Sequence, residues 1–148
     1  MLSALLIVNT TMIKADNDFS LAVELENDTL DISDHNLSKG PDDSRYYFWV
    51  KAIITNESIS PKKLTTWSCF GFGFHVESDS VRTAVKCRKN YPKIILLQPN
   101  KTYDIPLYLS FKKNYTGNTL KFKIRNCQIS YDGCVGWSKF VTINLRRK

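Results

Sequence analysis

Several common signals are missing from this sequence, and each absence excludes a class of protein. No segment approaches the ~20 consecutive apolar residues that a transmembrane helix needs. Apolar residues show almost no helical spacing, which argues against an α-helical fold. No pair of cysteines has the short C-x-x-C spacing of a zinc site, and His35 and His75 do not supply one. We therefore expect no transmembrane segment and no zinc site. The aspartates Asp28, Asp31, Asp34, Asp42 and Asp43 lack the spacing of a calcium loop, so we expect no metal, and calcium at one end of the fold is the alternative left open.

Size and hydrophobic content instead indicate a globular chain. The 148 residues are 43% hydrophobic and include 18 aromatic side chains (8 Phe, 7 Tyr and 3 Trp), which argues against disorder. We expect a single domain over residues 16–148, because residues 1–15 have features of a signal peptide: a short apolar run at residues 5–8 and a cleavage-type segment that ends at Ala15. No basic residue precedes the run, so an ordinary first strand is the alternative. Export predicts a secreted or periplasmic protein.

Apolar and polar residues alternate with a period of two between turn-rich stretches, which is typical of β-strands. The spacing predicts an all-β, immunoglobulin-like antiparallel β-sandwich of about 7 to 9 strands. Residues 46–55, YYFWVKAIIT, carry apolar bulk on both faces, so we place this strand in the centre of a sheet and Trp49 in the core. In residues 103–111, YDIPLYLSF, Pro106 has no backbone N–H to donate, which predicts an edge strand or a bulge.

Four cysteines fit an oxidising compartment and allow three pairings. They are Cys69, Cys87, Cys127 and Cys134. Closeness in the sequence favours disulfides between Cys69 and Cys87 and between Cys127 and Cys134.

The stretch TTWSCFGFGFHV, residues 65–76, is interpreted as a core strand because its alternate phenylalanines share one face. A hairpin with its loop at residues 77–80 matches the apolar faces of both strands and sets Phe74 opposite Thr83. The same register points the first two cysteines to opposite faces. An extra residue in a β-bulge would bring them together, and we predict one among residues 69–73.

The formal net charge of +7 falls to +6 after removal of residues 1–15, which contain only Lys14 as a charged residue. A basic face attracts nucleic acid, lipid head groups or acidic glycans. Lys121, Lys123 and Arg125 alternate, and we interpret them as the solvated face of a strand. We expect no nucleic acid partner, because an exported protein rarely meets one.

Catalytic patterns are weak in this sequence. The G-x-G at Gly71 and Gly73 is not followed by a helix that could hold a phosphate, so no cofactor is expected. His75 lies six residues from Cys69, which is roughly 20 Å along an extended strand and too far for a nucleophile and its base. His35 is a lone loop histidine, which is usually surface. We therefore expect a protein that is not an enzyme.

Six asparagines begin N-x-S/T triplets, either as glycosylation sites or as ordinary turn residues. They are Asn9, Asn27, Asn36, Asn56, Asn100 and Asn114.

Two motifs carry a family resemblance. Residues 48–58, FWVKAIITNES, and residues 97–102, LQPNKT, resemble the strand with an Asn-x-Ser turn and the Leu-Pro-x-x-Thr loop of the immunoglobulin-like bacterial intracellular proteinase inhibitor family. With the intervening WSC and CRKNYP, the pattern is also similar to small exported bacterial β-sandwich proteins of unknown function. The resemblance implies a sandwich fold. The cysteines and the predicted export depart from the intracellular family, so no functional residue is carried over.

These features predict a disulfide-stapled binding module without catalysis, with a protein or an extracellular glycan as its partner. The candidate binding rings are Trp67, Tyr131 and Trp137, and burial in the core is the alternative for both tryptophans. A second hypothesis is an inhibitor of a secreted hydrolase, such as a protease or a lysozyme-like enzyme. It would present the loop between Cys127 and Cys134 as a rigid segment.

Overall fold

The computed structural model describes residues 18–32, 37, 40–69, 72–84, 87, 89–127 and 136–147. The predicted signal peptide, residues 1–15, lies outside these ranges. The described part contains ten β-strands, and no helix within it is long and apolar enough to cross a membrane.

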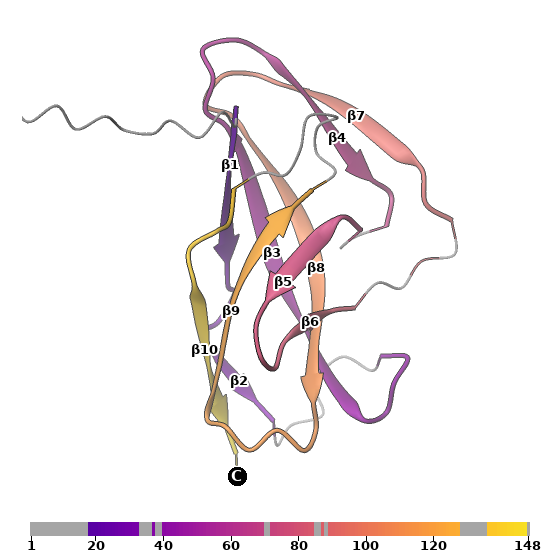
Figure 1. The fold of residues 1–148 in the computed structure, drawn as a ribbon, viewed down its shortest axis with the longest axis vertical. Helices are drawn as coiled ribbons and strands as arrows, with labels where there is room; N and C mark the ends of the chain where they lie inside the picture. Colours follow the sequence, from indigo (N-terminus) through magenta and orange to yellow (C-terminus); the bar gives the residue numbers. More distant parts are fainter. Residues whose placement is uncertain are drawn as a thin grey trace, which may run out of the picture.

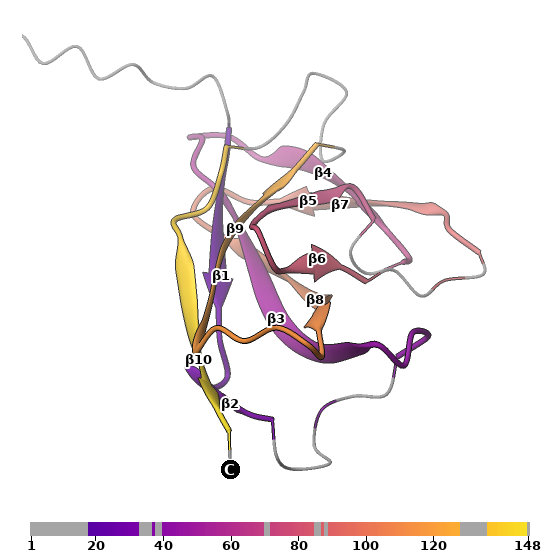
Figure 2. The ribbon, with the colours of Figure 1, turned by 60° about the horizontal axis from the view of Figure 1, so that its bottom comes forward.

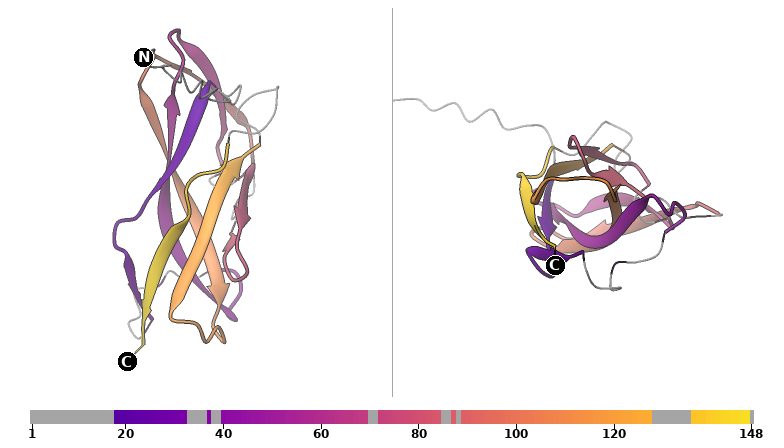
Figure 3. Two further views of the ribbon diagram at one scale, coloured as in Figure 1. Left: turned by 60° about the vertical axis from the view of Figure 1, so that its left-hand side comes forward. Right: turned by 90° about the horizontal axis from the view of Figure 1, so that it is seen from below.

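Eight strands form two four-stranded sheets that face each other across one core (Figure 1; Figure 3, right). The first sheet has the order β1-β3-β8-β6, with β1 (Phe19–Glu24), β3 (Arg45–Asn56), β6 (Arg82–Thr83) and β8 (Thr102–Lys112). The second sheet has the order β2-β10-β9-β5, with β2 (Thr29–Asp31), β5 (Phe74–Glu77), β9 (Thr119–Asn126) and β10 (Val141–Arg146). This is the strand order of an immunoglobulin-like sandwich in which the first strand is divided between the sheets, so the predicted fold class is confirmed.

The remaining two strands, β4 (Lys62–Trp67) and β7 (Pro92–Leu97), pair only with each other and form a ribbon at one end of the sandwich (Figure 2). Strand pairs are antiparallel, except that β2 runs parallel to β10. The parallel pair arises because the chain leaves the first sheet after Glu24 and joins the second sheet at Thr29.

The core lies between the two sheets, and strand alternation explains which residues reach it. β3 pairs with both β1 and β8, as predicted for a strand with apolar bulk on both faces. The ring of Phe48 in β3 packs edge to face against the ring of Phe122 in β9, with the ring centroids 6.4 Å apart. The side chains that are less than 2% exposed include Ala52, Ile54, Leu64, Leu107, Leu109, Phe111, Leu120, Phe122, Ile124 and Ile143.

Pro106 lies in β8, which pairs with β3 on one side and with β6 on the other. Tyr108 accepts a backbone hydrogen bond from Ala84 (2.8 Å), beside the pairing of β6 with Leu109 and Ser110. Residues two apart in a strand direct their backbone groups to the same side, so the ring nitrogen of Pro106 faces the side beyond this last described bond. The prediction of an edge strand or a bulge at Pro106 is wrong, because β8 is an inner strand and its register with β3 is continuous across Pro106. The inner strand accepts a proline here because, among the described residues, β6 pairs with β8 only at Leu109 and Ser110.

The predicted hairpin between Phe74 and Thr83 is wrong. β5 pairs with β9 in the second sheet, whereas β6 pairs with β8 in the first. The corner between them is held by Ser78, whose hydroxyl accepts hydrogen bonds from the backbone of Ser80 and Val81 (3.2 and 3.1 Å) and donates one to Lys121 O (2.8 Å). Apolar alternation fits any partner strand that faces the same core, so it does not distinguish a hairpin from a crossing between sheets.

A turn stands where one strand with a bulge was predicted. β4 ends at Trp67 and β5 begins at Phe74. Between them the N–H of Phe72 donates to Cys69 O (3.2 Å), and Gly73 has a φ of 79°, a conformation open mainly to glycine. The Phe72 side chain is 37% exposed, unlike the core position expected for it. Phe70 and Gly71 lie outside the described residues.

The disulfide between Cys69 and Cys87 is confirmed, with Cα atoms 5.6 Å apart. The turn removes the register conflict, because Cys69 is no longer on the same strand as Phe74. Cys127 is also disulfide-bonded, and Cys134 lies outside the described residues.

A buried asparagine joins the two family-like motifs. Asn56 is 0% exposed, and its Nδ2 donates to Ser60 O (2.9 Å) and to Leu97 O (2.8 Å). Its Oδ1 accepts hydrogen bonds from the backbone and hydroxyl of Ser58 (2.9 and 2.7 Å). Asn100, with a φ of 58°, donates its N–H to Asn56 O (2.8 Å). These bonds fix the corner at which the β3–β8 pair continues into the ribbon.

Candidate functional site

Three aromatic rings stack on the outer face of the first sheet, and we call Tyr47, Trp49 and Tyr108 the aromatic platform. Strand pairing sets Trp49 opposite Tyr108 and Tyr47 opposite Ser110. The ring centroid of Tyr108 lies 4.4 Å from that of Trp49 and 5.2 Å from that of Tyr47, and both pairs of rings are stacked. Tyr47 and Tyr108 are only 3% and 7% exposed, whereas Trp49 is 51% exposed. The indole is therefore open to solvent on a rigid aromatic base.

The segment before β3 covers Tyr47 and so fixes the base of the platform. A Cβ atom at Gly40 would overlap the Tyr47 ring, so this close approach requires glycine. The N–H of Asp42 donates to the Tyr47 hydroxyl (3.0 Å). Arg45 donates to the hydroxyl and carbonyl oxygens of Ser110 (2.9 and 3.1 Å).

Asp42 holds this segment in a turn, and its pKa offers a test. The hydroxyl and N–H of Ser44 donate to Asp42 Oδ1 (2.6 and 2.8 Å), and these bonds lower the pKa of Asp42 below its ordinary value of 3.8. Because the folded pKa is the lower one, the contribution of Asp42 to stability is present above pH 3.8 and is lost as the pH falls through the folded pKa.

We expect the substitution Ser44→Ala to raise the pKa of Asp42 toward its ordinary value, because the hydroxyl bond is the largest cause of the shift. Carboxyl-carbon NMR titration of wild type and variant measures the change. Equal titration midpoints in the two proteins would contradict the assignment.

A row of charged side chains beside Trp49 crosses β1, β3 and β8. Lys51 Nζ lies 3.1 Å from Glu24 Oε1 and 3.7 Å from Asp104 Oδ2. The hydrogen bond and charge of Glu24 raise the pKa of Lys51 above its ordinary value. The row and Trp49 line a hollow of about 420 Å³, together with Glu26 and Pro106.

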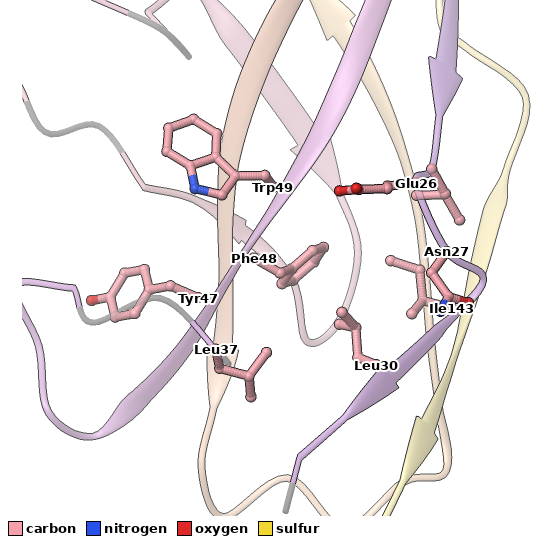
Figure 4. A pocket seen from close by; sticks show the side chains of 9 residues that line it. Glu26, Asn27, Leu30, Leu37, Tyr47, Phe48, Trp49 and Ile143 are labelled. Atoms are coloured by element: carbon pink, nitrogen blue, oxygen red, sulfur yellow. The ribbon is translucent and has the colours of Figure 1, made fainter. Parts of the chain in front are cut away.

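A second hollow, of about 480 Å³, also borders Trp49 and lies where the chain crosses between the sheets. Tyr47 and Trp49 point to one side of β3 and Phe48 to the other, and Glu26 lies across the gap (Figure 4). The apolar part of the lining of this second hollow comes from Leu25, Leu30, Leu37, Phe48 and Ile143. Trp49 and Glu26 thus border both hollows, of which the first also contains the charged row and the second has a mixed apolar and polar lining.

The structure places the sequence-predicted rings apart from this platform. Trp67, on β4, is half-buried and packs edge to face against Phe72 (5.0 Å between centroids). Its Nε1 is shielded from solvent and has no acceptor among the described residues. Trp137 is 38% exposed and lies beside Lys123 and Arg125 of the second sheet. Tyr131 lies outside the described residues, and the binding roles of all three rings stay predictions.

No protein-family model and no curated protein matches the chain. Among solved structures, the chain is similar to one described as the structure of the N-terminal domain of PorA. The two are 14% identical, with 86% of this chain and 97% of that chain covered and a TM-score of 0.38. A likeness at this TM-score carries no argument about function. The resemblance to the proteinase inhibitor family stays a prediction from its motifs.

Of the other candidate groups, two lie among the described residues. His75 is exposed on β5 opposite Arg125, and Cys69 is held in its disulfide. His35 lies outside the described residues. Across the described ranges, no three His, Cys, Asp or Glu side chains gather closely enough to hold a metal.

Proposed function

We propose that this protein is an extracellular or periplasmic binding module that holds a glycan on Trp49 without catalysing a reaction. The observation that carries the proposal is the solvent-open indole, 51% exposed, stacked on the buried ring of Tyr108. Sugar rings present a C–H face that packs on an indole. Because Trp49 is already packed against Tyr108, which itself stacks on Tyr47, little side-chain entropy is lost on binding.

The surroundings of Trp49 favour a glycan over a protein. Protein interfaces have cores that are depleted of charged residues. Trp49 is instead flanked by Glu24, Glu26, Lys51 and Asp104. Ionised carboxylates accept hydrogen bonds and an ammonium donates three, so this rim suits the hydroxyl groups of a sugar.

The disulfide between Cys69 and Cys87 supports an oxidising compartment. The inhibitor hypothesis depends on the loop between Cys127 and Cys134, which lies outside the described residues. It stays a prediction from the sequence.

We expect Trp49→Ala to weaken glycan binding by about 30-fold, because truncating a central aromatic anchor costs about 2 kcal/mol. A glycan array selects the ligand, and isothermal titration calorimetry measures its Kd for wild type and variant. The melting temperature should change little, since half of the Trp49 side chain is already in solvent.

Tyr91→Ala is the matched control, because Tyr91 is 63% exposed and lies beside the ribbon instead of the platform. It should leave the Kd unchanged. Equal weakening by both substitutions, or no glycan bound on the array, would overturn the proposal. Loss of a protein partner in Trp49→Ala, without any glycan binding, would assign the platform to a protein.

A further inference from the structure

The outer face of the second sheet, away from the platform, carries a row of cations whose direction is fixed by the core. Leu120, Phe122 and Ile124 of β9 are all 0% exposed. Strand alternation therefore turns the intervening Lys121, Lys123 and Arg125 to the outside. The prediction of a solvated strand face is confirmed for Lys121, which is exposed, whereas Lys123 and Arg125 are half-buried.

The segment before β10 sets two exposed rings among these cations. Ser138 is 5% exposed, its N–H donates to Ile124 O (2.8 Å), and its hydroxyl accepts from Ile124 N (3.1 Å). This anchor holds Trp137 and Phe140, which are 38% and 52% exposed, against β9.

Each ring lies close to two cations, and we call the five side chains the cation–aromatic row. Lys121 and Lys123 Nζ lie 4.8 and 5.0 Å from the centroid of Phe140. Lys123 Nζ and Arg125 Cζ lie 4.9 and 4.7 Å from the centroid of Trp137. Arg125 Nε is shielded from solvent and has no acceptor among the described residues, so an acceptor would meet the terminal N–H groups of the guanidinium. The charged groups are thus positioned before any ligand arrives.

The row keeps a positive charge. Glu77 lies opposite Lys123 and pairs with it (3.1 Å between Nζ and Oε1). Three cations and one carboxylate give the row a net charge of +2. Alternate residues of a strand are about 6.6 Å apart, so the three cations span about 13 Å along β9.

We propose that the cation–aromatic row binds a linear acidic polysaccharide that carries carboxylate or sulfate groups along its length. Arg125 suits such groups because a guanidinium donates to both oxygens of an anion at once. Single-stranded nucleic acid fits less well, because its binding relies on bases stacking on open ring faces. Here both rings already hold cations, and the disulfides point to a compartment where nucleic acid is scarce.

The test compares two double variants that lose the same charge. Lys121→Gln/Arg125→Gln changes the row, and Lys112→Gln/Lys113→Gln changes a basic pair at the end of β8. Fluorescence polarisation measures the Kd of a labelled heparin oligosaccharide and of a labelled polygalacturonate oligosaccharide at several salt concentrations. Dextran serves as the neutral probe and a single-stranded oligodeoxynucleotide as the other polyanion. Melting temperatures verify that both variants fold.

We expect the row variant to weaken binding of at least one acidic oligosaccharide by about 10-fold and the control variant to have a much smaller effect. In the row variant the slope of log Kd against log salt concentration should fall by about 1 to 2. Trp49→Ala should retain this binding, which separates this inference from the function proposed for the platform.

Three results would overturn the inference. Equal weakening by the two double variants would show only an effect of net charge. Absence of binding to both acidic oligosaccharides would remove the ligand class. Tighter binding of the oligodeoxynucleotide than of either sugar would assign the row to nucleic acid.

Discussion

Replacement of Asn56 by alanine is expected to lower the free energy of unfolding by about 3 kcal/mol. Asn56 is fully buried, and both ends of its amide are bonded to the chain. Alanine would leave the carbonyl of Leu97 and the N–H of Ser58 without these partners. A buried polar group that loses its hydrogen bond costs the desolvation energy of that group, and the corner between β3 and the ribbon would also lose its tie.

Urea unfolding followed by tryptophan fluorescence measures this loss. Asn114→Ala is the control, because Asn114 begins the same type of N-x-S/T triplet but is exposed. It should change the free energy of unfolding by less than about 0.5 kcal/mol. A similar small change for Asn56→Ala would contradict the structural role. The burial of Asn56 also means that its triplet cannot carry a glycan in the folded protein.

Removal of the disulfide between Cys69 and Cys87 is the second large effect, with an expected loss of about 3 kcal/mol. The two cysteines are 18 residues apart in sequence, and the bond limits the unfolded chain over that loop. In the folded protein it also ties the turn after β4 to the segment before β7. We expect the double variant Cys69→Ala/Cys87→Ala to fold but to unfold at a lower urea concentration.

The measurement compares wild type and double variant without reductant, because reductant would also break the disulfide at Cys127. Ser68→Ala, next to the bridge, controls for disturbance of the turn without loss of the covalent bond. An unchanged unfolding midpoint in the double variant would contradict the expected stabilisation.

Strand alternation was enough to predict the sandwich, because the core selects every second residue whatever the partner strand. It also placed β3 in the centre of a sheet, but Pro106 wrongly suggested an edge strand or a bulge in what is an inner strand. Which strands pair with each other was harder to predict from the sequence. The residues around Phe74 and Thr83 match as a hairpin, yet Ser78 turns the chain from one sheet to the other. This crossing depends on hydrogen bonds to a strand far away in the sequence, and the local pattern of apolar and polar residues does not reveal such bonds.

The aromatic platform was missed for a related reason. Trp49 lies on a strand with apolar residues on both faces, so the hydrophobicity of the sequence favoured burial of both faces. Lys51 and Thr55 share the face of Trp49 in the alternation, and they are the signal that could have identified it as the outer face. Stacking on Tyr108 depends on the register between β3 and β8, which a single sequence does not specify.

The division of the first strand between the two sheets has a mechanical consequence. β1 begins at one end of the sandwich, and β10 ends at the other (Figure 1). Tension between these ends would slide β2 along its parallel neighbour β10 instead of peeling it away. Bonds along the contact, including Asn144 N to Asp28 O (2.7 Å) and Ile32 N to Arg146 O (3.0 Å), would then bear the load together. A pull between these two ends would therefore load the β2–β10 contact in shear.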